Sequence, residues 1–378
     1  MGRVPHARAV QRGEPPHHDL SRDEDRADLV LPPDLPGRAS LWVQGTGKQV
    51  PGATRPHGEP LLRGIRTRGG VPTLIGPFGP LVLVADTQGP SRSIQGDLAA
   101  AESELRAGGM AFRTIAVAGP SEARTAAIGA LEAGDRFLVA VGGDALVNAI
   151  ADAMLHWSGD ASSDALLGVV AGSAPCDFIR TFGLPADPAQ ACRHLQGDDV
   201  FPIDAVRVAY HDHATAAAHF LNVAEVGLGG AIVRRTNRLP ASFGRARGFI
   251  GFWMAVGGFR PTDIRLRGDR RTWEGRAHNV LVANGQYTGG GYRMSPRSWP
   301  SDGYLDVLVM KGPKSDAFTI LNKAVLGEHL PHPNIVEYRC RTLSVETARP
   351  WPIQADGLVV GTTPASFEVL PQAIRLKI

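Results

Sequence analysis

The feature that most constrains the fold of this chain is an apolar strand that turns through two glycines and an aspartate into a helix. Residues 137–155 read FLVAVGGDALVNAIADAML. The unbroken apolar run at 137–141 indicates a strand that is buried on both faces, and Val147, Ile150 and Met154 then follow at helical spacing. The turn between them lies at the carboxyl end of a strand, where open α/β sheets bind ligands.

The same alternation of short apolar runs and helical periodicity covers the first part of the folded chain. Strands are expected at Leu81–Ala85, Ala111–Val117, Phe137–Val141 and Leu166–Val170. Helices are expected in the segments between them, at 94–105, 121–133 and 145–155. Strands that alternate with helices indicate βαβ units, and therefore a mostly parallel sheet with helices on its faces.

After Pro202 the helical periodicity weakens and β-type runs separated by glycine-rich turns predominate. These runs lie at 203–208, 219–223, 279–283, 305–310, 342–345 and 366–370. The pattern predicts a second domain built as an antiparallel β-sandwich. One apolar segment, Phe249–Phe259, is expected to be a buried core helix, and the alternative is that it lines a pocket for an acyl chain.

Composition separates an extension from the folded part. Residues 1–80 contain 12 of the 29 prolines and show no apolar period, so we expect a disordered extension there. Residues 81–378 carry 29 basic and 29 acidic side chains, and this balance argues against a nucleic-acid partner. The chain is therefore expected to divide into the extension, an α/β domain at 81–202 and a β-rich domain at 203–361.

Cysteine content and hydropathy limit the cellular setting. Three scattered cysteines, Cys176, Cys192 and Cys340, fit neither a disulfide framework nor a zinc site, which makes a reducing, cytoplasmic location the default. The longest apolar stretch, at 249–259, is far shorter than the roughly 20 residues of a transmembrane helix. We therefore expect no transmembrane segment.

The Gly142-Gly143-Asp144 turn supports two interpretations by itself. Glycines at this place let phosphates approach the backbone, the helix start offers unpaired N–H groups, and Asp144 can hold a magnesium ion or accept a proton. Alternatively, the segment is a plain tight turn in which Asp144 caps the helix. The turn alone does not decide between them.

A series of motifs in constant order resembles the diacylglycerol kinase catalytic family, whose members include sphingosine kinase and ceramide kinase relatives. The segments that carry the resemblance are GGDALVN at 142–148, the stretch from Gly168 to Pro185 with DFIRTFGLP, IDAVRV at 203–208, NVAEVGLGG at 222–230, ANGQYTGGGYRMSPRSWPSDGYLDVLV at 283–309 and Asp356-Gly357. They are similar to the GGDGT(L/V)N, GxxPxGTxNDFARxLGxP, (V/I)DLxRV, NxxSxGxDA, ANGxxxGGG with DDGxLD, and DGE motifs of that family. The match covers about residues 81–378.

The resemblance implies a three-layer α/β nucleotide domain, a β-rich lipid-substrate domain, and a last strand at about 362–378 that returns to the first domain. It also implies ATP and Mg²⁺ as cofactors and transfer of the γ-phosphoryl group to the hydroxyl of a diacylglycerol-like or sphingoid-like lipid. The protein would then be cytoplasmic and would meet its substrate at the inner membrane face. A homodimer is compatible with this expectation.

The resemblance also assigns roles to individual residues. Gly142, Gly143, Asp144, Ala145 and Asp177 would bind the nucleotide. Asp144 and Asp356 would be the catalytic carboxylates, with Asp356 as the general base, and Asp302 would hold a structural magnesium ion. A polar turn between strands is the alternative at Asp302.

Several positions depart from the family pattern. Ala145 stands in place of a glycine, Leu146 in place of a threonine, Cys176 in place of an asparagine and Leu358 in place of a glutamate. These changes motivate an alternative, a catalytically impaired lipid-kinase-like pseudoenzyme that binds lipid or nucleotide. A second alternative is an NAD-kinase-like enzyme, which shares the GGD turn, although the carboxy-terminal motif series argues against it.

Overall fold

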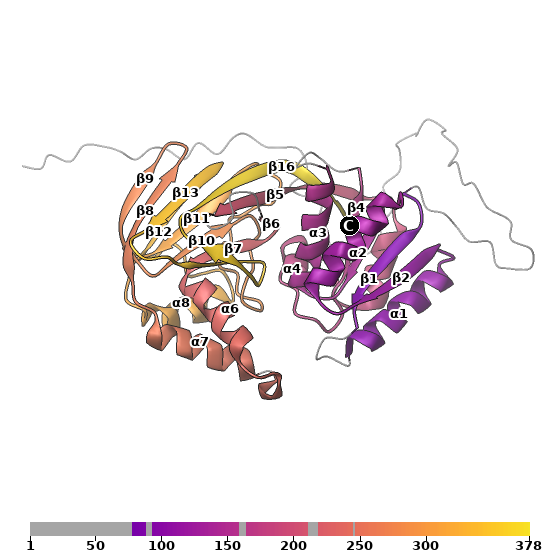
Figure 1. Ribbon diagram of the computed structural model, residues 1–378, viewed down its shortest axis with the longest axis horizontal. Coiled ribbons are helices and arrows are strands. Elements are labelled where there is room, and N and C mark those ends of the chain that lie inside the picture. The colour runs from indigo at the N-terminus through magenta and orange to yellow at the C-terminus, as the bar shows by residue number, and fades with distance from the viewer. Residues whose placement is uncertain (1–77, 88–92, 159–163, 211–217, 245) are drawn as a thin grey trace, which may run out of the picture. The chain divides into compact units, whose positions relative to one another are not determined.

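The computed structural model describes residues 78–87, 93–158, 164–210, 218–244 and 246–378 (Figure 1). The disordered extension that the sequence predicts at 1–80 lies outside these ranges except for its last three residues.

Strands and helices alternate in the first part of the described chain. The elements are β1 (Leu81–Asp86), α1 (Ser93–Ala107), β2 (Phe112–Val117), α2 (Pro120–Glu132), β3 (Phe137–Val141), α3 (Asp144–Ser158), β4 (Leu166–Val170), α4 (Phe178–Phe182) and α5 (Pro188–Gln196). The strands lie in the order β2-β1-β3-β4, and every neighbouring pair is parallel. Parallel strands of this kind need apolar residues on both faces, and β1, β3 and β4 provide them.

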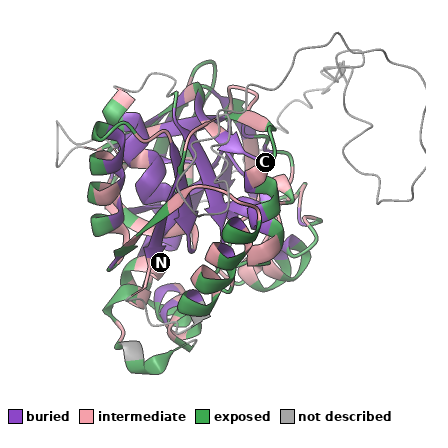
Figure 2. Cartoon of the chain, turned by 90° about the vertical axis from the view of Figure 1, so that its right-hand side faces the viewer, coloured by how far each residue is buried: buried purple, intermediate pink, exposed green. Residues whose placement is uncertain are grey.

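Two helical layers cover this parallel sheet. Val82 and Val84 of β1 point to the face that α2 and α3 cover, whereas Leu81 and Leu83 point to the face that α1 and α5 cover. Figure 2 shows the buried strands between helices whose outer sides are exposed. The three-layer α/β architecture expected from the sequence is therefore confirmed.

The second part of the chain supplies mostly antiparallel strands. They are β5 (Val200–Tyr210), β6 (Ala218–Phe220), β7 (Val223–Gly227), β8 (Thr262–Gly268), β9 (Thr272–Ala277), β10 (Asn279–Ala283), β11 (Leu305–Met310), β12 (Ile335–Cys340), β13 (Thr342–Thr347), β14 (Pro352–Ala355), β15 (Leu358–Thr362) and β16 (Ala365–Lys377). A six-stranded sheet, in the order β12-β11-β10-β7-β14-β15, packs against the sheet that contains β5, β8, β13 and β16. One apolar core fills the space between the two sheets, which confirms the β-sandwich.

The last strand, β16, connects the two parts of the molecule. It pairs antiparallel with β13 and with β5, and its end pairs parallel with β4. The parallel sheet and one sheet of the sandwich therefore form a continuous ten-stranded sheet. The domain boundary expected at residue 202 falls within β5, because β5 follows β16 across both parts.

Helices interrupt the β-rich part in segments for which the sequence predicted no strand. They are α6 (Leu228–Arg238), the 3₁₀ turn η1 (Ala241–Phe243), α7 (Ala246–Gly258) and α8 (Asp316–Ala324). The expected helix at 249–259 exists as α7, but its assignment to the buried core is wrong: only Gly251 and Ala255 are buried, and Phe249 is 68% exposed. The helix packs mainly through its small residues, and three of its large apolar side chains, Phe249, Trp253 and Met254, remain exposed.

None of the helices in the described ranges is long and apolar enough to cross a bilayer.

Candidate active site

The site expected from the sequence lies where two loops follow neighbouring parallel strands. The GGD turn follows β3, and the segment 171–177 follows β4. The Asp144 amide lies 3.4 Å from the carbonyl oxygen of Pro175, and a Cβ atom added to Gly143 would lie 2.4 Å from that same oxygen. The two loops are therefore in direct contact, and this contact requires a glycine at position 143.

Asp144 begins α3 but caps a different helix. Its two carboxylate oxygens accept hydrogen bonds from the backbone N–H groups of Asp177 and Phe178, each at 2.8 Å. These donors lie at the start of α4, which otherwise lacks a side-chain cap. The Cys176 thiol also donates to Asp144 at 3.5 Å, so the residue that replaces the expected asparagine still presents a donor.

Asp177 joins the α/β part to the β-rich part. Its Oδ2 atom accepts a hydrogen bond of 2.7 Å from the backbone N–H of Gly290, which lies in the glycine-rich turn after β10. Arg180, one helical turn further on, places its Nε atom 3.4 Å from the other carboxylate oxygen. Asp177 is buried and therefore has a structural role in addition to any contact with a nucleotide.

Asp356 occupies the tight turn between β14 and β15. Asp356 and Gly357 both have positive φ, 46° and 82°, and they are the two loop residues between Ala355 and Leu358, which pair with each other. Asp-Gly is a favoured pair for a two-residue hairpin turn of this backbone type. The Asp-Gly pair therefore accounts for the positive φ angles of this turn.

The Asp356 carboxylate points at the segment between β6 and β7. It accepts backbone hydrogen bonds from Leu221 at 2.8 Å, Asn222 at 3.1 Å and Val223 at 2.9 Å. Asn148 of α3 adds a side-chain hydrogen bond to Oδ2 at 3.1 Å. This last contact brings the proposed base to the helix that begins with Asp144.

Asn148 is a site residue that sequence reasoning did not select. Its Nδ2 atom also donates to the His219 carbonyl at 2.7 Å, so one amide connects α3 to two segments of the β-rich part. Asp152, a further turn along α3, accepts a 2.9 Å hydrogen bond from the His219 ring. Asp144, Asn148 and Asp152 are spaced by four residues and therefore lie on one face of α3. This spacing could have identified Asn148 and Asp152 from the sequence.

Asp152, His156 and His219 also place one ligand atom each within 4.8 Å of one another. Arg124 pairs with the Asp152 carboxylate at 2.6 Å. Although burial acts in the opposite direction, hydrogen bonds from His219 and Arg124 hold the pKa of Asp152 below its ordinary value. Because the Asp152 carboxylate is already paired with an arginine, we interpret this cluster as a structural contact between α3 and β6 and not as a metal site.

Three acidic side chains thus converge at the site from separate segments of the chain. Burial raises the pKa of Asp144 to about 6, and the negative charges of Asp356 and Asp177 contribute in the same direction. Burial likewise raises the pKa of Asp177 and of Asp356. A group of carboxylates that repel one another in a partly buried place suits a divalent cation and the phosphates that it carries, so the residues present fit magnesium-bound ATP.

Two altered positions in the glycine turn have different consequences. Ala145 lies inside α3, and the only non-glycine residues with positive φ in the described chain are Asp356 and Gln372, so the backbone at position 145 does not require glycine. Leu146 lies over the turn instead: its Cδ2 atom is 2.9 Å from the place of a Cβ on Gly142. The leucine side chain therefore covers part of the turn where the family has a threonine.

The loop around Asp302 does not fit the magnesium ion that the resemblance implies. Arg339 of β12 donates to the Asp302 carboxylate, and its Nε atom lies 3.2 Å from Asp306. The guanidinium group also lies over the Tyr304 ring, 4.9 Å from its centroid. An arginine thus supplies the positive charge between the two carboxylates, and we derive no step from a metal there.

Gly285, in the ANG segment after β10, is held close to Asn222. A Cβ atom at Gly285 would lie 1.9 Å from Asn222 Oδ1 and 3.2 Å from Thr181 Oγ1. The same threonine oxygen accepts the backbone N–H of Gln286 at 3.1 Å. These contacts form another junction between α4 and the β-rich part, and nothing in the residue spacing predicted it.

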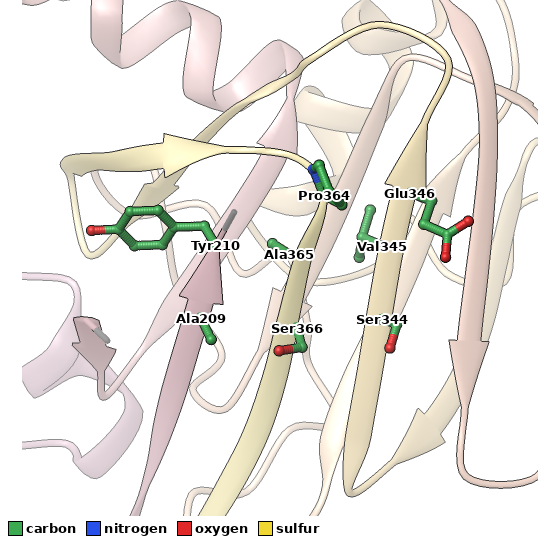
Figure 3. A pocket seen from close by; sticks show the side chains of 8 residues that line it. All are labelled: Ala209, Tyr210, Ser344, Val345, Glu346, Pro364, Ala365 and Ser366. Carbon is green, nitrogen blue, oxygen red and sulfur yellow. The ribbon is translucent and has the colours of Figure 1, made fainter. Parts of the chain in front are cut away.

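A separate depression of about 360 Å³ lies on the strands β5, β13 and β16 (Figure 3). Tyr210, Ser344, Glu346 and Ser366 are the polar residues that line it. None of its lining residues belongs to the carboxylate group described above, and it is not part of the candidate active site.

Comparisons with known proteins agree with this arrangement. Residues 80–208 match the diacylglycerol kinase catalytic domain, and residues 222–378 match the YegS C-terminal NAD kinase beta sandwich-like domain. Together these two matches span most of the chain.

Individual relatives carry lipid kinase names. The lipid kinase YegS of Escherichia coli K12 is 25% identical over 64% of this chain and 77% of its own length. A Xanthomonas euvesicatoria protein named "Probable lipid kinase YegS-like" is 27% identical over 63% of this chain and 77% of its own. The crystal structure of a diacylglycerol kinase from Bacillus anthracis superposes with a TM-score of 0.60 at 19% identity, covering 79% of this chain and 95% of that one, which shows the shared fold.

Proposed function

The chain belongs to the family that joins a diacylglycerol kinase catalytic domain to a YegS C-terminal domain, and from this premise we propose that it is an ATP-dependent lipid kinase. In the proposed reaction, the γ-phosphoryl group passes to the hydroxyl of a diacylglycerol-like or sphingoid-like lipid at the inner membrane face. Phosphoryl transfer of this kind depends mainly on positioning and on neutralisation of charge.

The observation that supports this function best is the convergence of Asp144, Asp177 and Asp356. They belong to the turn after β3, the loop after β4 and the β14–β15 hairpin, which are far apart in the sequence. Burial raises the pKa of Asp144 to about 6, and the negative charges of Asp356 and Asp177 add to this shift. Each carboxylate also accepts backbone hydrogen bonds, but a group of buried or partly buried carboxylates beside the carboxyl ends of parallel strands is typical of a site that binds a nucleotide with a divalent cation.

We assign the phosphates to the start of α3. Gly143, Asp144 and Ala145 are partly exposed there, and the first N–H groups of a 15-residue helix favour negative charge. Asp144 would hold the magnesium ion, because its carboxylate is ionised above its raised pKa and its oxygens retain lone pairs beside the two backbone donors. Bound Mg²⁺ would supply neutralisation of phosphate charge.

We assign proton removal from the lipid hydroxyl to Asp356. As the hydroxyl oxygen forms its bond to the γ-phosphorus and the bond to the ADP oxygen breaks, the hydroxyl proton passes to the carboxylate. Four N–H donors occupy this carboxylate in the present conformation, and of these four the Asn148 amide alone belongs to a side chain, which can move without a shift of the backbone. We therefore propose that the substrate hydroxyl displaces the Asn148 amide from Oδ2.

A lipid panel tests the proposed function. The full chain would be incubated with γ-labelled ATP, magnesium and mixed vesicles that contain diacylglycerol, a sphingoid base, ceramide or a polyprenyl alcohol. We expect labelled lipid with at least one of these acceptors. The absence of label in every lipid, under conditions in which an active relative labels its own substrate, would exclude the proposal.

A second candidate function is favoured by Leu146, whose side chain lies over the glycine turn. A pseudoenzyme would bind lipid or nucleotide without turnover because the turn is covered. The double substitution Ala145→Gly with Leu146→Thr restores the family residues at both positions. Activity that appears only in this variant supports the pseudoenzyme, whereas activity in the wild type excludes it.

A further inference from the structure

Large apolar side chains are exposed on one group of helices in the β-rich part. Of the ten large hydrophobic residues that are exposed in the described chain, seven belong to η1, α7, α8 and the turn after α8. They are Phe243, Phe249, Trp253, Met254, Phe318, Val325 and Leu326. Figure 1 shows α6, α7 and α8 together on one side of the strands. Single exposed apolar residues are ordinary, but a group confined to adjacent helices indicates a binding surface.

The rings of α7 and α8 form one continuous cluster. Phe249 and Trp253 are four residues apart on α7, and their ring centroids are 6.1 Å apart. Trp253 in turn lies 5.3 Å from Phe318 of α8. We call Phe249, Trp253, Met254 and Phe318 the aromatic face. The face is 38% exposed at Trp253 and 68% exposed at Phe249, so it is open to a partner.

Polar contacts underneath fix the position of the aromatic face. A Cβ atom on Gly251 would lie 2.1 Å from Thr236 Oγ1, so α7 and α6 touch at backbone distance. Arg247 donates to the Thr236 carbonyl at 3.1 Å. Lys314 donates to the carbonyl oxygens of Val256 and Phe259 and so caps the end of α7. The exposed rings are therefore presented by anchored helices.

The segment that contains α6 and α7 carries charge of one sign. Residues 228–260 contain six arginines and no aspartate, glutamate or lysine. Arg234, Arg238 and Arg260 are exposed, and within the described part of the chain no carboxylate forms an ion pair with them. An apolar face that contains tryptophan and is flanked by uncompensated arginines has the composition of an interfacial membrane-binding helix.

We propose that the aromatic face docks onto a bilayer rich in anionic phospholipid, and that α7 lies in the plane of the interface. The rings would insert at the level of the headgroups, and the arginines would contact lipid phosphates. This inference rests on the proposed function, because a kinase for a bilayer-resident lipid must reach its acceptor at that surface. The one-signed charge favours an anionic bilayer over a second copy of this chain, whose matching face would carry the same charge.

Vesicle co-sedimentation without ATP tests the docking separately from catalysis. The full chain would be mixed with phosphatidylcholine vesicles that contain 0% or about 40% phosphatidylglycerol. We expect binding that is at least tenfold tighter to the anionic vesicles, and a double variant Phe249→Gln with Trp253→Gln that loses at least tenfold in affinity. The variant Arg234→Gln with Arg238→Gln should lose about fivefold per charge and should show a weaker dependence on salt.

Trp157→Gln is the matched control, because Trp157 is 37% exposed but lies on α3, outside the aromatic face. Phosphorylation of a short-chain, monomeric diacylglycerol gives a second readout, which substitutions in the aromatic face should leave unchanged. Equal binding of all proteins to both kinds of vesicle would overturn the proposal. So would a dimer in solution that the Phe249→Gln, Trp253→Gln variant alone dissociates, since a second copy would then cover the face.

Discussion

Asp144 is the residue whose surroundings alter its chemistry most clearly. Burial, with the charges of Asp356 and Asp177, raises its pKa to about 6. Since magnesium requires the ionised carboxylate, kcat/KM for ATP should fall about tenfold for each pH unit below 6. Initial rates from pH 4.5 to 8 give the profile, and circular dichroism at each pH controls for unfolding. A profile that is flat through pH 6 would contradict the assignment of Asp144 to the cation.

Arg339 provides a second prediction for a single residue. Replacing it with glutamine removes the cation between Asp302 and Asp306 and leaves two neighbouring carboxylates. We expect the variant to be less stable by about 1 kcal/mol, because the pair is partly exposed, and to regain stability in millimolar Mg²⁺ or Ca²⁺.

Thermal melts with and without the metal measure this effect. Arg341→Gln is the control, because Arg341 lies over the same Tyr304 ring at 5.1 Å but forms no ion pair with Asp302 or Asp306. If Arg339→Gln melts at the same temperature in metal and in chelator, the arginine does not take the place of a cation.

At the scale of elements, strand β7 contains a partly buried carboxylate, Glu225, whose hydrogen-bond partners are neutral. Glu225 accepts hydrogen bonds from Asn279 at 2.8 Å and Gln354 at 3.3 Å, and burial raises its pKa above 4.5. A raised pKa in the folded state means that the stability contributed by this group is complete below pH 4.5 and is lost as the pH rises through the folded-state value.

Glu225→Gln removes that titration while it keeps the size of the side chain. The variant should therefore gain stability relative to the wild type as the pH rises from about 4.5 to 8, because only the wild type has to ionise this group in the folded state. Denaturant unfolding at pH 4.5 and pH 8 measures the difference, with Glu346→Gln as an exposed control. If the free energies of unfolding of the variant and the wild type differ by the same amount at both pH values, ionisation of Glu225 does not destabilise the folded state.

The elements also show which sequence signals are reliable. The strands β1, β3 and β4 were predictable because each contains five consecutive buried residues without a polar side chain, which leaves few alternatives. Strand β14 is four residues long and begins with proline, and β15 is half-buried with no alternation of buried and exposed residues, so neither had a clear apolar period. The exposure of α7 was not predictable, because a helix that is apolar all round normally indicates burial.

Within the candidate site, the local sequence could predict where a residue lies in the fold but not which groups it hydrogen-bonds. The sequence after β3 predicted that Asp144 follows the carboxyl end of that strand at the start of a helix, and the structure places it there. Its hydrogen bonds to the start of α4 depend on how the loop after β4 folds back. The contact of Arg339 with Asp306 depends on strand register, since these two residues are directly paired between β11 and β12.

At the scale of the whole molecule, covalent continuity and polar contacts both join the two parts. Strands β5 and β16 run through the shared sheet, while Asn148 and Asp177 of the α/β part hydrogen-bond to Asp356 and Gly290 of the β-rich part. Asn148→Ala removes a buried amide that donates to both the His219 carbonyl and Asp356, so we expect the variant to be less stable by about 1–3 kcal/mol in denaturant unfolding. If the substrate hydroxyl displaces this amide, kcat of the folded variant should stay close to that of the wild type.

The central claim is that this chain transfers phosphate to a lipid hydroxyl with Asp356 as the base. The most direct measurement is the rate at which γ-labelled phosphate appears in the lipid phase, for the wild type and for Asp356→Asn. Asn-Gly suits the same hairpin turn, so the β14–β15 loop keeps its backbone while the carboxylate is lost. We predict labelled lipid with the wild type and a rate at least 100-fold lower with the variant. No labelled lipid with the wild type, or equal rates for two folded proteins, would contradict the account.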